Sequence, residues 1–239
     1  MKGIILAGGT GSRLYPLTKV TNKHLLPIGH MPMIYHPIKK LTQAGIEDIL
    51  IVTGVDHMGD IVNLLGSGRE FKCRFTYKVQ DEAGGIAQAL YLAKEFIDTD
   101  KMVVVLGDNI FEDDLKPFVT NFNKQKKGAR ILLKEVSDPQ RFGVVEIKNN
   151  KIKTIEEKPK KPKSKFAVVG IYFYDSTVFE IIKGLKPSGR GELEISDVNN
   201  MFLKRNSLEY EIMSGWWTDA GTFDSIERAT LLVEGRIKL

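Results

Sequence analysis

The sequence predicts an α/β fold with a mixed, mostly parallel central sheet and an inserted β-rich part. Three observations support this fold class. Short apolar runs without polar alternation predict strands that are covered on both faces. In the first half of the chain these runs alternate with helical patterns, an order that produces parallel strands joined by right-handed crossovers. The second half carries closely spaced strand patterns with short turn-rich links, which predict strand pairs.

The first half, about residues 1–128, alternates strand and helix. Gly45 and Gly66 supply stop signals after its first two helices. The four expected strands are Lys2–Ala7, Asp48–Thr53, Phe75–Val79 and Met102–Leu106. The expected helices are Ile34–Ala44, 56–65, Ile86–Ile97 and Leu115–Gln125. This order predicts an open, Rossmann-like sheet with helices on both faces, the three-layer αβα arrangement.

The second half, about residues 129–239, is richer in strands and is expected to complete a single domain that spans residues 1–239. Its final helix is expected to pack back on the sheet of the first half. The expected strands are Arg130–Val136, Gly143–Ile147, Ile152–Glu156 and Ala167–Tyr174. The expected helices are Thr177–Ile182, Ser196–Leu203 and Thr222–Glu234.

The composition is that of a folded cytoplasmic protein. The chain has 239 residues, of which 42% are hydrophobic and 27% charged, so wholesale disorder is excluded. No apolar run approaches the roughly 18 residues that a membrane span needs. The apolar run before the first glycines is too short for a signal peptide. The single cysteine, Cys73, excludes an internal disulfide and suits a reducing compartment.

The net charge of +5 admits nucleic acid, a membrane surface or small polyanions as partners. Five of its 35 basic residues are lysines gathered between Lys158 and Lys165. We interpret most of them as a solvated loop, because no aromatic residue is interleaved and no nucleic-acid-binding fold is recognisable. Neither nucleic acid nor a membrane is therefore an expected partner.

A glycine-rich loop, residues 8–13 (GGTGSR), follows the first strand. Glycines let backbone N–H groups approach a phosphate, and ligands of α/β sheets bind at the carboxyl ends of strands. The loop lacks the Gly-Lys-Ser/Thr of a Walker motif, and Leu14 stands where a dinucleotide fingerprint needs glycine. The glycines alone are equally compatible with a plain turn. Arg13 and Lys23 favour a phosphate site, because neither lies on a helix face where charge is routine.

Asp108 follows the apolar strand Met102–Leu106, so its side chain is expected at the carboxyl end of that strand, beside the loop. Mg²⁺ typically takes one or two carboxylates together with substrate phosphates. Gly-Asp-Asn is also turn chemistry. The residues alone leave both a metal ligand and a turn former open.

Several segments together resemble the sugar-1-phosphate nucleotidyltransferases, and within them the thymidylyl-transferring members most. The first is residues 3–14 (GIILAGGTGSRL) followed by 23–27 (KHLLP). Six more follow in the family's order over nearly the whole chain: 85–89 (GIAQA), 106–109 (LGDN), 142–145 (FGVV), 156–159 (EEKP), 191–197 (GELEISD) and 218–222 (TDAGT).

The resemblance implies an enzyme that makes two polyanions react. A phosphate oxygen of glucose 1-phosphate would attack the α-phosphorus of dTTP, giving dTDP-glucose and pyrophosphate for deoxysugar synthesis of the dTDP-rhamnose type. The implied cofactor is Mg²⁺. Such a transfer depends on positioning and charge rather than on a nucleophilic side chain. The resemblance also allows a homo-oligomer.

The resemblance assigns site residues to both halves. The catalytic set is Arg13, Lys23, Asp108, Lys158 and Asp219, with Asp108 and Asp219 as the metal ligands. The first half becomes the nucleotide-binding part, and the second becomes the sugar-binding part with the second metal aspartate and the terminal helix. Further substrate contacts are assigned to Leu6, Gly8, Gly9, Thr10, Gly11, Gln80, Gly85, Asn109, Gly143, Glu157, Val168 and Arg190.

Two alternatives remain open. The Gln80 amide can bind the N3–H and O4 edge that thymine and uracil share, so a uridylyltransferase on the same fold fits this residue equally well. A non-catalytic regulator that binds a nucleotide sugar would retain the same pocket. The presence of Arg13, Lys23, Asp108 and Asp219 together favours an enzyme.

Overall fold

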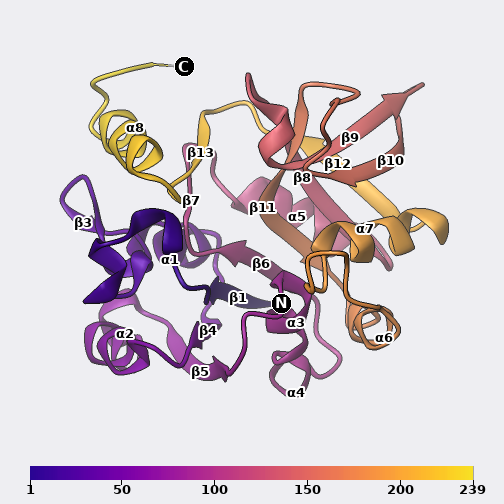
Figure 1. The fold of residues 1–239 in the computed structure, drawn as a ribbon. Helices are drawn as coiled ribbons and strands as arrows, with labels where there is room; N and C mark the ends of the chain where they lie inside the picture. Colours follow the sequence, from indigo (N-terminus) through magenta and orange to yellow (C-terminus); the bar gives the residue numbers. More distant parts are fainter. Residues whose placement is uncertain (239) are drawn as a thin grey trace.

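The strand β1 (Lys2–Ala7) lies inside the main sheet of the computed structural model, which describes residues 1–238 (Figure 1). It pairs in parallel with β4 (Asp48–Gly54) on one side and with β6 (Met102–Leu106) on the other. Beyond β4, the strand β5 (Arg74–Gln80) adds in parallel. The four strands expected from apolar runs in the first half are thus present, in the expected parallel arrangement.

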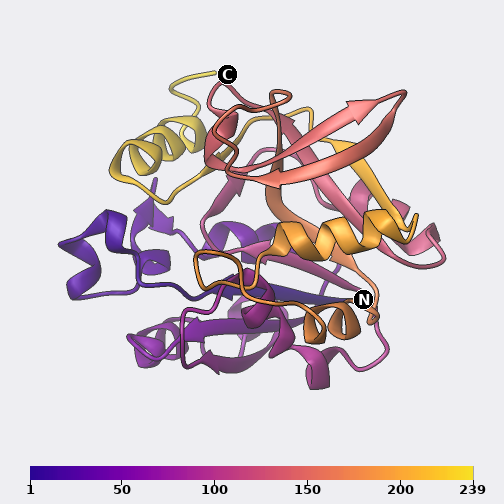
Figure 2. The ribbon, with the colours of Figure 1, turned by 45° about the vertical axis from the view of Figure 1, so that its right-hand side comes forward.

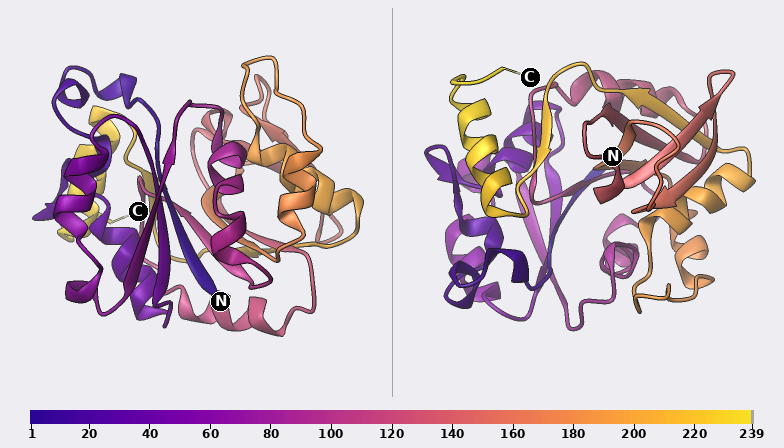
Figure 3. Two further views of the ribbon diagram at one scale, coloured as in Figure 1. Left: turned by 90° about the horizontal axis from the view of Figure 1, so that it is seen from below. Right: turned by 45° about the horizontal axis from the view of Figure 1, so that its top comes forward.

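Both faces of β1 are buried, which explains why its apolar pattern does not alternate. Ile4 and Leu6 pack into one hydrophobic core with α3, α6 and α7, while Ile5 and Ala7 pack into another with α1, α2 and α5. Figure 3 shows the strands between these two groups of helices, which is the predicted three-layer arrangement. These helices are α1 (Tyr35–Gln43), α2 (Met58–Leu65), α3 (Ile86–Tyr91), α5 (Lys116–Lys124), α6 (Val178–Lys183) and α7 (Ile195–Lys204).

The second half extends the sheet through the strand β11 (Phe166–Tyr174), which runs antiparallel to β6. On β11 are built β8 (Ala129–Glu135) and β9 (Gly143–Lys148), both antiparallel, and β10 (Lys151–Glu157) forms a hairpin with β9. The helix α7 packs against β10 (Figure 2). The expected strand pairs of the inserted part are therefore present, and the sheet is mixed.

Several short strands were not expected from the sequence. The strand β12 is half-buried and pairs with β8, whereas the others form two separate two-stranded sheets. Strands of two or three residues carry no periodic signal and exist only through their pairing. The unexpected strands are β2 (Pro27–Ile28), β3 (Met31–Pro32), β7 (Asn109–Phe111), β13 (Trp217–Asp219) and the five-residue β12 (Leu208–Ile212).

Helices differ from expectation in two places. The segment expected as one helix over Ile86–Ile97 is divided into α3 and α4 (Lys94–Ile97), because N–H groups at Leu92 and Ala93 bond to carbonyls three residues back. The last helix, α8 (Phe223–Val233), packs against β2 and β13 instead of the main sheet. Short 3₁₀ helices cover Ser12–Leu14, Leu17–Lys19, Lys23–Leu25, Arg69–Phe71 and Pro139–Arg141. Within residues 1–238, no helix is both long and apolar enough to cross a membrane.

Candidate active site

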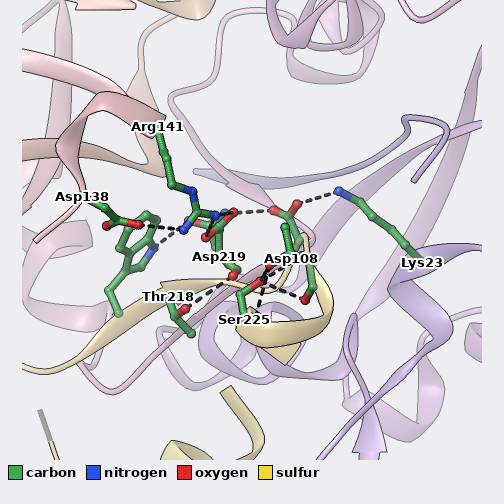
Figure 4. A network of polar contacts seen from close by, with 10 residues as sticks. Lys23, Asp108, Asp138, Arg141, Thr218, Asp219 and Ser225 are labelled. Carbon is green, nitrogen blue, oxygen red and sulfur yellow. Dashed lines mark hydrogen bonds and ion pairs between the residues drawn. The ribbon is translucent and has the colours of Figure 1, made fainter. Parts of the chain in front are cut away.

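Asp108 and Asp219 are held together by neighbouring strands. Asp108 directly precedes β7, and the antiparallel register of β7 and β13 places Asn109 opposite Asp219. The backbone N–H of Ala220 donates to the carbonyl of Asp108 at 2.8 Å. Two acidic residues far apart in the sequence therefore meet at one place (Figure 4).

Asp108 is held as a carboxylate by its neighbours. The Nζ of Lys23 lies 2.6 Å from one carboxylate oxygen, and the Nδ2 of Asn109 donates to the other at 3.0 Å. Burial raises the pKa of Asp108, but the charge and hydrogen bond of Lys23, together with smaller contributions that include the hydrogen bond from Asn109, hold the pKa well below its usual range. The Lys23 and Asp108 side chains are each only 14% exposed, so solvent screens this pair weakly.

Asp219 is held by Arg141, whose Nη2 donates to both carboxylate oxygens at 3.0 and 3.1 Å. The same guanidinium pairs with Asp138 and lies over the ring of Phe142, 5.2 Å from its centroid. Burial raises the pKa of Asp219, and the nearby charge of Asp108 raises it further, against the lowering effect of Arg141 and two other cations. The two carboxylates therefore feel each other's charge.

This pair of carboxylates fits a divalent cation. The mutual repulsion that raises the pKa of Asp219 would be relieved by a positive ion between the two groups. Among the described residues, His, Cys, Asp and Glu side chains form no group of three or more that could hold a metal. The remaining ligands of such an ion would have to come from phosphates and water, a ligand set typical of Mg²⁺ sites.

Two cavities meet at Asp108. One, of about 220 Å³, is walled by Leu6, Gly8, Gly9, Lys23, Gln80, Gly85 and Asp108, among others. The other, of about 230 Å³, is walled by Arg13, Asp108, Asn109, Gly143, Glu157, Lys158, Val168 and Asp219, among others. Ile86, Leu106 and Asp108 line both. Most of the predicted site residues therefore surround two adjoining spaces, with the metal-ligand candidate at the junction.

The glycine loop is shaped by close approach and by backbone conformation. A Cβ atom at Gly8 would lie 2.8 Å from the Oε1 of Gln80, so only glycine leaves that oxygen free of a clash. Gly9 and Gly11 have φ of 94° and 61°, which glycine adopts at little cost. Thr10 and Gly9 line a third hollow beside Lys23. The carbonyl of Gly11 accepts a hydrogen bond from Thr18 at 3.0 Å.

Arg13 approaches Asp219 at a glycine. A Cβ atom at Gly221 would lie 2.9 Å from the Nη2 of Arg13 and 3.3 Å from an oxygen of Asp219. Both groups thus lie beside the same glycine, and the charge of Arg13 lowers the pKa of Asp219. Of the two predicted cations, Lys23 pairs with Asp108 and Arg13 lies near Asp219.

Glu157 and Lys158, at the end of β10, line the second cavity. Ser196 donates to one oxygen of Glu157, and the Nζ of Lys158 lies 3.8 Å from the other. Arg190 is not among the residues that wall this cavity. Its guanidinium is bound by Glu194 at 2.9 Å and lies 3.9 Å from Glu157, so it is linked to the cavity through that carboxylate.

Comparison with known proteins identifies the family. The model for nucleotidyl transferases matches residues 2–235. The chain belongs to the nucleotidyl transferase family. A glucose-1-phosphate thymidylyltransferase of Neisseria meningitidis is 46% identical over 238 residues, which cover 98% of this chain and 83% of that protein. The enzyme of the same name from Mycolicibacterium smegmatis is 44% identical over 230 residues, which cover 95% and 80%.

Two solved structures share the fold of this nucleotidyl transferase. A Bacillus anthracis protein proposed to be a glucose-1-phosphate thymidylyltransferase, determined in complex with sucrose, has 64% identity and a TM-score of 0.95 over 100% of this chain and 97% of its own. A UDP-glucose pyrophosphorylase complexed with UDP-glucose has 25% identity and a TM-score of 0.85 over 99% of both chains. The predicted fold class and family are thereby confirmed.

Several residues that support the site of this nucleotidyl transferase were not expected from the sequence. Arg141 directly precedes the segment 142–145 that carries the resemblance, and that adjacency was the available signal. Trp217 and Gly170 donate to the side-chain oxygen of Asn109 at 2.7 and 2.9 Å. Since Asn109 is only 2% exposed and its amide is already engaged, its expected contact with substrate stays a prediction.

Proposed function

We propose that this nucleotidyl transferase transfers a thymidylyl group from dTTP to glucose 1-phosphate, giving dTDP-glucose and pyrophosphate in a Mg²⁺-dependent reaction. The observation that carries the proposal is the position of Asp108 at the junction of two cavities, beside Asp219. A site of this form suits a reaction in which two separately bound anions must meet. The choice of substrates is supported by the names of relatives that are 44–46% identical.

The proposed reaction needs no covalent intermediate. A phosphate oxygen of glucose 1-phosphate forms a bond to the α-phosphorus of dTTP, and the bond from that phosphorus to the α–β bridging oxygen breaks. The electron pair leaves with pyrophosphate, opposite the attacking oxygen. Since the attacking oxygen is already anionic, no general base is required, and the protein supplies orientation and positive charge.

The two halves of the chain are proposed to hold the two substrates. The glycine loop and Gln80 line the cavity proposed for dTTP, and Gly143, Glu157 and Lys158 line the cavity proposed for the sugar phosphate. Glu192 from the second half also lines the first cavity, so the division near residue 128 is not strict. Residue 239, where the proposed second part ends, lies outside the described residues.

Positive side chains offset the repulsion between the two substrates. Lys23 and Arg13 reach the acidic pair from the loop, and Lys158 stands half-exposed on the far side of the second cavity. Asp108 and Asp219 would hold Mg²⁺, which when bound neutralises phosphate charge and aligns the reacting oxygens. With metal and phosphates present, the cations Lys23 and Arg141 are free to exchange a carboxylate partner for a phosphate.

The first prediction concerns the acidic pair. Asp108→Asn and Asp219→Asn keep side-chain shape but remove the charge, so each should lower kcat by about 10³-fold or more and weaken metal binding. Pyrophosphate release measures the first effect, and calorimetric titration of Mg²⁺ or Mn²⁺ measures the second. The matched control is Asp224→Asn, an exposed aspartate on α8, which should leave both unchanged. Wild-type turnover and metal affinity in either test variant would end the metal assignment.

A uridylyltransferase is the second candidate, because the UDP-glucose pyrophosphorylase structure superposes over 99% of this chain. A panel of dTTP and UTP with glucose 1-phosphate and Mg²⁺ separates the two, with kcat/KM as the measure. We expect dTTP to be the better substrate. Tight dTDP-glucose binding without turnover in either direction would indicate a non-catalytic regulator.

Light scattering during chromatography tests the proposed homo-oligomer, and fractionation of cells tests the proposed cytoplasmic location.

A further inference from the structure

The side-chain amide of Gln80 lies at the end of β5, 8% exposed, in the wall of the cavity proposed for the nucleotide. A primary amide has two ends of similar shape and opposite hydrogen bonding: the oxygen accepts, and the nitrogen donates. Which end faces the base decides which base fits. The orientation of this amide is therefore a determinant of substrate choice.

One backbone group, the N–H of Gly84, fixes that orientation through a neighbouring residue, Gln88 of α3. The N–H of Gly84 lies 3.0 Å from the side-chain oxygen of Gln88, and an N–H can only donate. The atom of Gln88 that faces it must therefore be Oε1. The same Oε1 accepts from the Nε2 of Gln80 at 2.7 Å.

The carbonyl of Gly85 gives independent support for the position of the amide nitrogen of Gln80. Its oxygen lies 3.3 Å from the Nε2 of Gln80, and a carbonyl can only accept. Both partners of this atom are acceptors, so it must be the amide nitrogen, and both of its hydrogens are committed to the protein. The contact at 2.7 Å is the stronger of the two by distance.

The opposite end of Gln80 is turned toward the loop. Its Oε1 is the atom that a Cβ at Gly8 would approach to 2.8 Å, and Gly8 lines the same cavity. Within residues 1–238, no protein group donates a hydrogen bond to this oxygen. Gln80 therefore offers the nucleotide an acceptor and no donor, so of the N3–H and O4 edge expected for it, only N3–H can bind to this side chain.

We propose that Gln88 is a positioning residue that makes Gln80 present only its carbonyl, and so restricts the site to pyrimidines that carry an N–H at N3. Thymine and uracil have that N–H. Cytosine has a lone pair at N3, which would face the Gln80 oxygen with both acceptors unpaired. This inference rests on the proposed function only in taking the first cavity as the nucleotide site.

Gly84 supports the arrangement. A Cβ atom at this position would lie within 2.4–2.5 Å of the amide atoms of Gln88, so only glycine allows the contact. The restriction on the base thus depends on two consecutive hydrogen bonds. The N–H of Gly84 donates to the oxygen of Gln88, and that oxygen accepts from the nitrogen of Gln80.

The test uses dUTP and dCTP, which differ only in the edge at N3 and C4. Gln88→Met keeps length but cannot hold the Gln80 amide, which then turns to suit either base. The ratio of kcat/KM for dUTP to that for dCTP, with glucose 1-phosphate and Mg²⁺, should fall about 10- to 100-fold. Gln88→Glu retains an oxygen for Gly84 and Gln80, so it should keep the ratio within about threefold of wild type.

The controls separate selectivity from folding and from the identity of the reaction. Gln43→Met, at an exposed position on α1, should leave the ratio unchanged. Gly84→Ala should displace Gln88 by collision and lower the ratio, which keeps the test open if Gln88→Met does not fold. An equal loss for both nucleotides in Gln88→Met and Gly84→Ala would overturn the proposal.

Binding without sugar distinguishes this proposal from the proposed function. Calorimetric Kd values for dUTP and dCTP should follow the same ratio in each variant. If wild-type protein prefers UTP to dTTP, the thymidylyl assignment fails while the effect of Gln88 on the dUTP:dCTP ratio still stands. If wild-type protein binds dCTP as tightly as dUTP, the inference about Gln88 fails whatever the reaction.

Discussion

At the scale of single residues, Asn109 is the side chain that joins the site to the fold. Its oxygen accepts from Trp217 on β13 and from Gly170 on β11, and its nitrogen donates to Asp108. The amide thus links β7 to β13 and to β11 of the main sheet, and it orients a carboxylate. It is 2% exposed, so water cannot replace these bonds if the side chain is removed.

Asn109→Ala should therefore lower the free energy of unfolding by about 2–4 kcal/mol, since it leaves the indole N–H and a backbone N–H buried without acceptors. Urea unfolding measures this, and Asn123→Ala on the exposed side of α5 is the matched control, expected within about 0.5 kcal/mol of wild type. A change below 1 kcal/mol in Asn109→Ala would show that the amide does not support the strands.

The sequence predicted residues whose place follows from local structure. Gln80 ends the strand β5 and Asp108 follows the apolar strand β6, and the carboxyl end of a parallel strand is where ligands bind. Arg141 could not be found in this way, because its partner Asp219 is 78 residues away and the contact is made only by folding. Gln88 was visible as part of a matched segment, but the direction of its amide depends on Gly84.

At the scale of elements, the start of α8 follows closely after β13 and is held by side-chain hydrogen bonds. Thr222 accepts a hydrogen bond from the N–H of Ser225, and Ser225 in turn accepts from the N–H of Thr222, which forms a capping box. The helix begins at Phe223, four residues after Asp219, so this cap holds the backbone close to the second carboxylate.

Thr222→Ala should lower the free energy of unfolding by about 1 kcal/mol through loss of the cap. Thr222→Ser retains the hydroxyl and should remain close to wild type. Denaturant unfolding of both variants measures the difference. Equal stability of the alanine and serine variants would show that the cap contributes nothing, and that packing alone holds α8 in place.

Elements were predictable where the local pattern agreed with the burial. The apolar run of β6 predicts the observed strand because both of its faces lie in a core. The strands β7 and β13 have three residues each, and only their pairing makes them strands. They are also the elements that bring the two carboxylates together, so the decisive step in forming the site has no local sequence signal.

At the scale of the whole molecule, the site lies where the parallel part of the sheet meets the antiparallel part. β6 has β1 on one side and β11 on the other, and Leu106 at its end lines both cavities. One half of the chain alone would leave each cavity with a missing wall. The single domain over residues 1–239 stays a prediction.

Acid stability is a property of this whole arrangement, because a neutral imidazole is buried within it. His24 is 1% exposed, and its Nδ1 lies 2.7 Å from the side-chain oxygen of Asn22. Burial lowers the pKa of His24 to about 3, and the charge of Lys23 lowers it too, against the opposite effect of Asp108. An unfolded histidine has a pKa near 6.5, so only the unfolded chain takes up this proton in mildly acidic solution.

The stability from the buried imidazole is therefore fully present above pH 6.5 and is lost as the pH falls toward the folded value. Between pH 7 and 4.5 this group alone should lower the free energy of unfolding by about 2–3 kcal/mol. Urea unfolding at a series of pH values measures the slope. His24→Gln should flatten it, whereas His30→Gln, whose side chain is 94% exposed, should not. If the slope is the same in His24→Gln as in wild type, the acid sensitivity comes from other groups.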